Sequence, residues 1–134
     1  MTTAILPGRF QPPHLGHVLT LMRIYPLYDH IIIAVTEYTY GGKKKQVIPP
    51  ELSKKILEDI FQHLPKFEVI LAGKGFIARS RESFDDLPKF DVIVTGNLEV
   101  IRRMEKLGIK SRYVKRTKGL RGWTGRELRA ALWP

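Results

Sequence analysis

Hydrophobic residues in this chain follow two kinds of pattern, short continuous runs and positions spaced three or four apart. The run 31–35 consists only of Ile, Ala and Val, which is typical of a strand buried on both faces of a parallel sheet. Runs of this kind predict strands at 3–6, 30–36, 67–71, 90–95 and 109–114. Helical spacing, with Pro or Gly near the ends, predicts helices at 15–25, 51–63, 99–107 and 124–132.

The alternation of strands and helices predicts an α/β fold. We expect a Rossmann-like, doubly wound, five-stranded parallel sheet with helices on both faces and right-handed crossovers. The 134 residues lie in the size range of one domain, so a single domain over 1–134 is expected. Ligands of such folds bind at the carboxyl ends of the strands, where the strand order reverses.

Composition narrows the class of protein. Hydrophobic residues make up 43% of the chain, which is enough for a core. No run approaches the ~20 apolar residues of a membrane span, and Met1-Thr2-Thr3 lacks the basic start of a signal peptide. The absence of cysteine excludes a disulfide framework, a thiol nucleophile and cysteine-ligated zinc. We therefore expect a cytoplasmic protein with no membrane partner.

The charge indicates an anionic partner. The formal net charge is +10, which suits a nucleotide, a polyphosphate or a nucleic acid. The cations concentrate in Lys43, Lys44 and Lys45 and in the C-terminal third, where a solvated basic surface is the alternative. Aromatic residues are not interleaved with the basic ones as a base-stacking platform requires. We therefore favour small-molecule anions over nucleic acid.

The strongest motif is the sequence GRFQPPHLGH at 8–17, directly behind Ala4-Ile5-Leu6. A short strand leads into a tight loop and then a helix, and His14 and His17, three apart, are expected on one face of that helix. Helix N-termini favour phosphate through unpaired N–H groups and a partial positive charge. A helix cap or a half-buried packing pair is the alternative.

Arg9 stands at the end of the predicted strand. A guanidinium group binds oxyanions in a bidentate way better than an ammonium group does. A phosphate or substrate contact is therefore expected of Arg9, and a surface arginine is the alternative.

The motif GRFQPPHLGH resembles the signature of the nucleotidyltransferases that carry His-x-Gly-His, and it is most similar to the archaeal type of nicotinamide mononucleotide (NMN) adenylyltransferase. The resemblance implies transfer of AMP from ATP to a phosphomonoester, here NMN to give NAD, with release of pyrophosphate. It implies that His14 and His17 contact the triphosphate and stabilise charge in the transition state, with Arg9 beside them. The nucleotide-binding residues that it implies in this loop are Gly8, Phe10 and Gly16.

A second motif near the C-terminus is similar to the Ser-(Gly/Ser)-Thr-x-x-Arg that closes the site in this family. Thr124 and Gly125 fall on its first two positions and Arg129 on its last, whereas Arg126 replaces the threonine. The resemblance implies that Arg129 is catalytic and that Thr124, Gly125 and Arg126 bind the nucleotide. The alternative is a helix start in which Thr124 and Glu127 form a capping box.

The tripeptide Thr95-Gly96-Asn97 follows a predicted strand and resembles the Thr/Ser-Gly-Asn beside the nucleotide in NMN adenylyltransferases. Nucleotide binding is thus implied for all three residues. An ordinary strand-to-helix turn with Asn97 as the N-cap is the alternative.

No group of His, Asp and Glu has the spacing of a metal site, so Mg²⁺ is expected to be held mainly through the triphosphate. The resemblance further implies a homo-oligomer. It leaves the acceptor open, because the middle of the chain lacks the Asn-Pro-Phe stretch and the tryptophan of archaeal NMN adenylyltransferases.

Other activities therefore stay open. Arg116-Thr117-Lys118-Gly119-Leu120 is similar to the Arg-Thr-x-Gly-Ile of small cytidylyltransferases of the glycerol-3-phosphate type. Phosphopantetheine and flavin mononucleotide are alternative acceptors. A non-catalytic nucleotide- or RNA-binding protein is the alternative from another class.

Overall fold

A parallel sheet forms the centre of the computed structural model, which describes residues 1–36, 48–73 and 87–115. Within these ranges five strands pair in the order β3-β2-β1-β4-β5, and every pair is parallel. The strands are β1 (Thr3–Gly8), β2 (His30–Thr36), β3 (Phe67–Gly73), β4 (Val92–Thr95) and β5 (Ser111–Tyr113). The α/β class and the five-stranded parallel sheet are as predicted.

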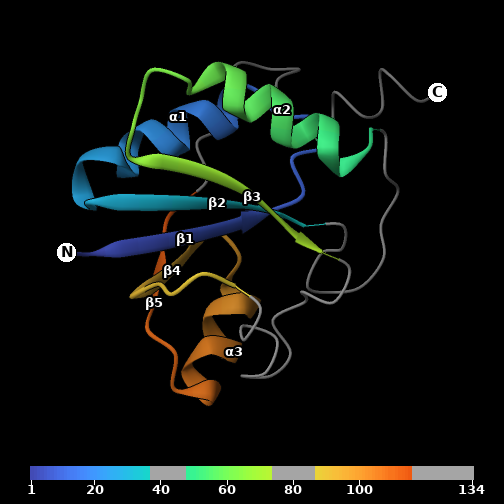
Figure 1. The fold of residues 1–134 in the computed structure, drawn as a ribbon. Coiled ribbons are helices and arrows are strands. Elements are labelled where there is room, and N and C mark those ends of the chain that lie inside the picture. The colour runs from blue at the N-terminus through green and yellow to red at the C-terminus, as the bar shows by residue number, and fades with distance from the viewer. Residues whose placement is uncertain (37–47, 74–86, 116–134) are drawn as a thin grey trace.

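Helices cover both faces of this sheet, again as predicted (Figure 1). The helices α1 (Leu15–Ile24) and α2 (Pro50–Ile60) lie on one face, and α3 (Leu98–Leu107) lies on the other. A short 3₁₀ helix, η1 (Tyr25–Leu27), follows α1 and contains the proline that was expected to end it. Gly108 follows α3 with a φ of 70°, the left-handed conformation that glycine adopts readily at a helix C-terminus.

The element boundaries differ from prediction by a few residues. β1 and β3 each run two residues further than expected because β1 stays paired with β2 as far as Gly8↔Val35, and β3 stays paired with β2 as far as Thr36↔Gly73. The helix predicted at 51–63 starts one residue earlier and ends at Ile60. β4 and β5 are shorter than expected. The predicted helix 124–132 lies outside the described residues.

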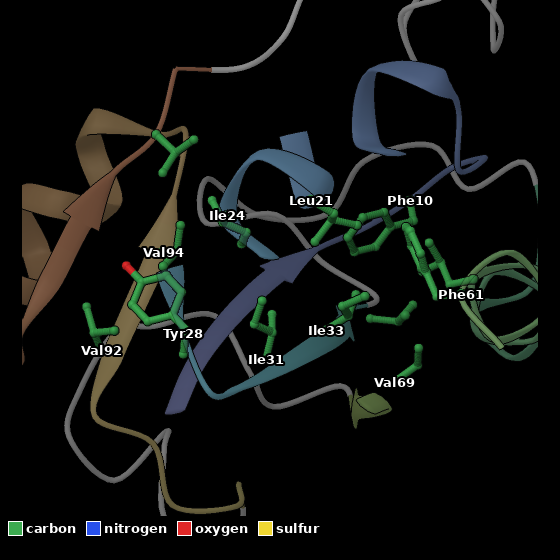
Figure 2. Packing of buried hydrophobic residues seen from close by; sticks show 14 residues of the cluster. Phe10, Leu21, Ile24, Tyr28, Ile31, Ile33, Phe61, Val69, Val92 and Val94 are labelled. Atoms are coloured by element: carbon green, nitrogen blue, oxygen red, sulfur yellow. The ribbon is translucent and has the colours of Figure 1, made fainter. Parts of the chain in front are cut away.

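Buried side chains form two clusters, one on each face of the sheet. Ile31, Ile33 and Val35 of β2 join the cluster beneath α1 and α2, whereas Ile32 and Ala34 join the cluster beneath α3. Figure 2 shows the first cluster, in which Phe10 packs with Leu21 and other core residues. β2 is therefore buried on both faces, as its sequence predicts, and the loop behind β1 is tied into the core through Phe10.

Candidate active site

The reversal of strand order lies between β1 and β4. From β1 the chain passes to α1 on one face, and from β4 it passes to α3 on the opposite face (Figure 1). The two connections diverge at the carboxyl edge of neighbouring parallel strands, which is where ligands of doubly wound folds bind. Two segments with predicted site residues follow the strands at this edge: the histidine loop, residues 8–17, after β1, and Thr95-Gly96-Asn97 at the end of β4.

The two histidines are brought together by a helix cap. The His14 residue is the N-cap of α1, with a φ of −143°, so it precedes the helix. The N–H of Gly16 donates to Nδ1 of His14 (3.1 Å), and the N–H of His14 donates to Nδ1 of His17 (3.2 Å). The rings stack with centroids 3.8 Å apart and planes inclined by 27°.

The two histidine rings lie together, but not for the predicted reason, which was that His14 and His17 share one face of a helix. A shared helix face is wrong for His14, because its backbone is extended. The rings meet through the reciprocal arrangement of a capping box, in which each end of the first turn bonds the other. The alternative interpretation, a half-buried capping pair, is therefore correct as a description of the local structure, and it does not exclude a role for the same rings at a phosphate.

The capping bonds also set which nitrogen of each ring carries the proton. A neutral imidazole has one acceptor nitrogen and one N–H. Since Nδ1 of both rings accepts a backbone N–H, the hydrogen-bond network assigns the N–H of each neutral ring to Nε2. Both His14 and His17 are thus hydrogen-bond donors at Nε2, which suits a phosphate oxygen and not a metal ion.

Arg9 and Phe10 lie in the turn between β1 and the histidines. Arg9 is only 9% exposed, so it is not the surface arginine of the alternative interpretation. Phe10 has a φ of 51°, a conformation that non-glycine residues rarely adopt. Its ring is 3% exposed and meets the ring of His17 edge-on, with centroids 4.7 Å apart. The Phe10 side chain therefore supports His17 from the core.

Gly8 and Gly16 have packing roles in the same loop. A Cβ atom on Gly8 would lie 2.9 Å from Cε2 of Phe10, which is closer than side-chain contacts allow. Gly16 is buried in the first turn of α1 and supplies the N–H that His14 accepts. Both glycines thus keep the histidine loop closely packed.

Two polar residues at this loop were missed by the sequence analysis. The hydroxyl of Ser53 in α2 donates to the carbonyl oxygen of Phe10 (2.7 Å), and the side-chain amide of Gln11 pairs with the backbone of Ile48. Ser53 shares the buried stripe of α2 with Pro50 and Leu57, so a polar residue at a core position is the signal that could have found it. Gln11 carries no comparable signal.

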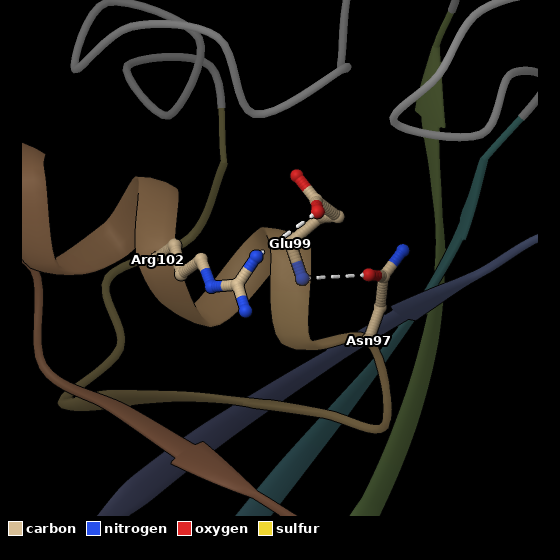
Figure 3. A network of polar contacts seen from close by, with 3 residues as sticks. All are labelled: Asn97, Glu99 and Arg102. Carbon is tan, nitrogen blue, oxygen red and sulfur yellow. Dashed lines mark hydrogen bonds and ion pairs between the residues drawn. The ribbon is translucent and has the colours of Figure 1, made fainter.

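The segment Thr95-Gly96-Asn97 connects the end of β4 to the start of α3. Oγ1 of Thr95 accepts from the N–H of Asn97 (3.1 Å), and Oδ1 of Asn97 accepts from the N–H of Glu99 (2.9 Å). Figure 3 shows the hydrogen bond between Glu99 and Asn97 together with the ion pair between Glu99 and Arg102. Asn97 is therefore the N-cap that the alternative interpretation predicts, and nucleotide binding by these residues stays a prediction.

Replacing Asn97 with alanine is expected to destabilise the fold by about 1 kcal/mol, because α3 loses its side-chain cap. Urea denaturation measures this free energy of unfolding. The variant Asn97→Ser keeps a capping oxygen and is expected to stay close to the original protein. Equal stability of the alanine and serine variants would contradict a capping role for Asn97.

The remaining predicted site residues lie outside the described residues. They are Thr124, Gly125, Arg126 and Arg129 of the C-terminal motif. The basic run Lys43, Lys44 and Lys45 also lies outside the described residues. Among the residues that the structure does describe, no group of three or more His, Asp or Glu side chains could hold a metal ion. Within those same ranges, no helix is long and apolar enough to cross a membrane.

Comparison with known proteins shows the family. The family model described as Cytidylyltransferase-like matches residues 5–117. This chain belongs to the cytidylyltransferase-like family. The match includes the histidine loop and Thr95-Gly96-Asn97, and it ends before the C-terminal motif at 124–129.

Curated relatives that this chain matches in sequence include phosphopantetheine adenylyltransferases. The protein of Flavobacterium johnsoniae is 39% identical over 70 residues, and that of Bdellovibrio bacteriovorus is 34% identical over 70 residues. The match covers 52% of this chain in both cases, and 44% and 42% of the respective relatives. The matched segment thus spans less than half the length of either relative.

Solved structures show the same fold. A bifunctional NMN adenylyltransferase/ADP-ribose pyrophosphatase from Francisella tularensis, complexed with AMP and a manganese ion, gives a TM-score of 0.68 at 17% identity, covering 97% of this chain and 41% of that one. The lipopolysaccharide core biosynthesis protein from Thermoplasma volcanium gives 0.61 at 21% identity, covering 89% and 98%. At these identities the likeness shows the fold alone.

Proposed function

We propose that this chain is a nucleotidyltransferase that transfers AMP from ATP to a phosphomonoester acceptor. The observation that carries this proposal is the stacked pair His14 and His17, whose N–H groups are set at Nε2 by the cap of α1. The pair lies at the carboxyl edge of β1, beside the reversal of strand order, where a nucleotide is expected to bind.

In this reaction an oxygen of the acceptor's phosphate attacks the α-phosphorus of ATP. A new P–O bond forms, the bond from the α-phosphorus to the bridging oxygen breaks, and pyrophosphate leaves with that electron pair. The protein supplies no covalent intermediate, so catalysis consists of positioning and of stabilising negative charge. His14 and His17 would donate from Nε2 to oxygens of the triphosphate, and Arg9 would bind an oxyanion beside them.

The leaving pyrophosphate needs cations as well. The resemblance of 124–129 to the family motif supports Arg129 as its partner, with Thr124, Gly125 and Arg126 beside the β- and γ-phosphates. Mg²⁺ would be held mainly by the phosphate oxygens, since Nδ1 of both histidines already accepts a backbone N–H. Bound in this way, the ion would neutralise charge on the leaving group.

Two acceptors are supported by different observations. NMN, which would give NAD, is supported by the Gly-Arg-Phe-Gln-Pro lead-in at 8–12. Phosphopantetheine is supported by relatives that are 39% and 34% identical over 70 residues. Both acceptors present a phosphomonoester that can attack the α-phosphorus, and the histidine pair is proposed to bind the triphosphate, which is the same with either acceptor. The rest of the acceptor must be recognised elsewhere in the chain.

Pyrophosphate release with Mg²⁺ tests this proposal directly. ATP and CTP are each combined with NMN, phosphopantetheine, flavin mononucleotide and glycerol-3-phosphate, and products are identified by mass. We expect release with ATP and with NMN or phosphopantetheine, in step with formation of the adenylylated product. Turnover with CTP and not with ATP would show that the nucleotide donor is CTP. If the folded protein binds ATP or RNA but releases no pyrophosphate with any pair of substrates, the proposal fails and a non-catalytic binding protein takes its place.

A further inference from the structure

The histidine loop contains one residue, Phe10, whose unfavourable backbone conformation requires contacts with other parts of the chain. Phe10 has a φ of 51°, in the left-handed region that is unfavourable for residues with a Cβ atom. Such a conformation persists only where the surroundings fix it. The carbonyl oxygen of Phe10 accepts from Oγ of Ser53 at 2.7 Å, and Ser53 is fully buried at 0% exposure.

The next residue, Gln11, is fixed by hydrogen bonds with Ile48, which lies close to Ser53 in sequence. The side-chain amide of Gln11 donates from Nε2 to the carbonyl oxygen of Ile48 (2.9 Å) and accepts at Oε1 from the N–H of Ile48 (2.9 Å). Gln11 is 1% exposed. Two bonds to one residue fix both the position and the orientation of the amide, as the two donors and one acceptor of a carboxamide allow.

Both contacts come from one short stretch of chain. Ile48 lies two residues before α2, and Ser53 lies in its first turn and a half. The stretch 48–53 thus forms hydrogen bonds with two successive residues, Phe10 and Gln11, which lie between β1 and the cap of α1. The ring of Phe10 in turn meets the ring of His17, and the chain reaches His14 three residues after Gln11.

We propose that Gln11 and Ser53 are positioning residues for the histidine pair, which fix the loop so that the rings of His14 and His17 stack with their N–H groups at Nε2. Neither residue is required to touch the substrate. The kinetic consequence rests on the proposed function, whereas the effect on the histidine rings does not. Since a misplacement of about 1 Å can cost roughly 100-fold in rate, the two residues belong to the machinery of the site.

The variants are chosen to separate hydrogen bonding from packing. Gln11→Met keeps a chain of similar length and loses both bonds to Ile48, whereas Gln11→Ala loses the bonds and the volume. Ser53→Ala removes the bond to Phe10. The matched controls are Gln62→Ala, at an exposed glutamine after α2, and Ser111→Ala, at the start of β5.

Two measurements test the effect of these variants on the histidine pair and on catalysis. ¹⁵N NMR of the histidine side chains reports which ring nitrogen carries the proton, and it needs no substrate. Steady-state kinetics with ATP then separates kcat from KM. We expect Gln11→Met and Ser53→Ala to lose the pure Nε2–H signature of His14 and His17. We also expect kcat to fall roughly 10- to 100-fold, with KM for ATP changed less than about threefold.

Each outcome decides the proposal. Unchanged ring signals in Gln11→Met and Ser53→Ala would overturn it, and so would a loss of kcat without any change in those signals. If the Gln11 variants fail to fold, Ser53→Ala against Ser111→Ala gives the same decision. If the unaltered protein shows no turnover, the proposed function fails, and the ring signals still test the positioning role.

Discussion

Replacing His17 with alanine is expected to lower kcat by roughly 100- to 1,000-fold, the usual cost of removing one donor to a developing oxyanion. The ring of His17 carries an N–H at Nε2, because its Nδ1 accepts the N–H of His14. Alanine removes this donor and also removes the partner on which the ring of His14 stacks. Pyrophosphate release under saturating ATP measures the loss.

A second variant separates the two roles of His17. Asparagine in its place can offer an oxygen near the position of Nδ1 and so keep the cap, but it lacks the donor at Nε2. We expect His17→Asn to retain most of the stability and to lose activity nearly as far as His17→Ala. His63→Ala is the control, since His63 is exposed beyond the end of α2. Full activity in His17→Asn would show that the histidine serves only as a cap.

Replacing Gly8 with alanine is expected to destabilise the protein by about 1–3 kcal/mol, the range for an overpacked core. The added Cβ would stand 2.9 Å from Cε2 and 3.1 Å from Cζ of Phe10. The ring is buried in the core cluster and meets the ring of His17, so a displacement of the Phe10 ring disturbs the support of His17. We therefore expect activity to fall together with the free energy of unfolding, which urea denaturation measures.

The double variant Gly8→Ala/Phe10→Leu tests that mechanism. A leucine side chain is smaller than the phenyl ring and leaves room for the new Cβ atom, so the two changes are expected to be coupled by 0.5 kcal/mol or more, roughly the lower limit for residues in contact. The double variant should be more stable than the sum of the two single changes predicts. Simple additivity would show that Gly8 is required for another reason, such as close approach of a ligand.

The sequence is most informative where a structure depends on residues close together in the chain. The β-branched run of β2 predicts its bounds, His30–Thr36, because burial on both faces leaves a purely local signature. Gly108 marks the end of α3 for a similar reason. The boundaries of β1 and β3 are less accurate, because their last residues are strand only through pairing with a neighbour.

The site shows the same limit. The motif at 8–17 predicts that the histidines meet, but the spacing rule points to a shared helix face, whereas a capping box forms instead. Gln11 and Ser53 act through contacts with residues 37 and 43 positions away in sequence. A polar residue at a core position of α2 marks Ser53 as unusual, but no local pattern identifies the partner of either side chain, so these contacts are found only in the folded chain.

The proposed function requires that His14 and His17 donate from Nε2 to a nucleoside triphosphate. A ¹⁵N NMR titration of the histidine side chains with a non-hydrolysable ATP analogue and Mg²⁺ tests it most directly. We expect Nε2 of His14 and His17 to shift in saturable fashion, while His63 stays unchanged and both Nδ1 atoms remain acceptors. Saturable binding of the analogue without any shift at these two rings would contradict it.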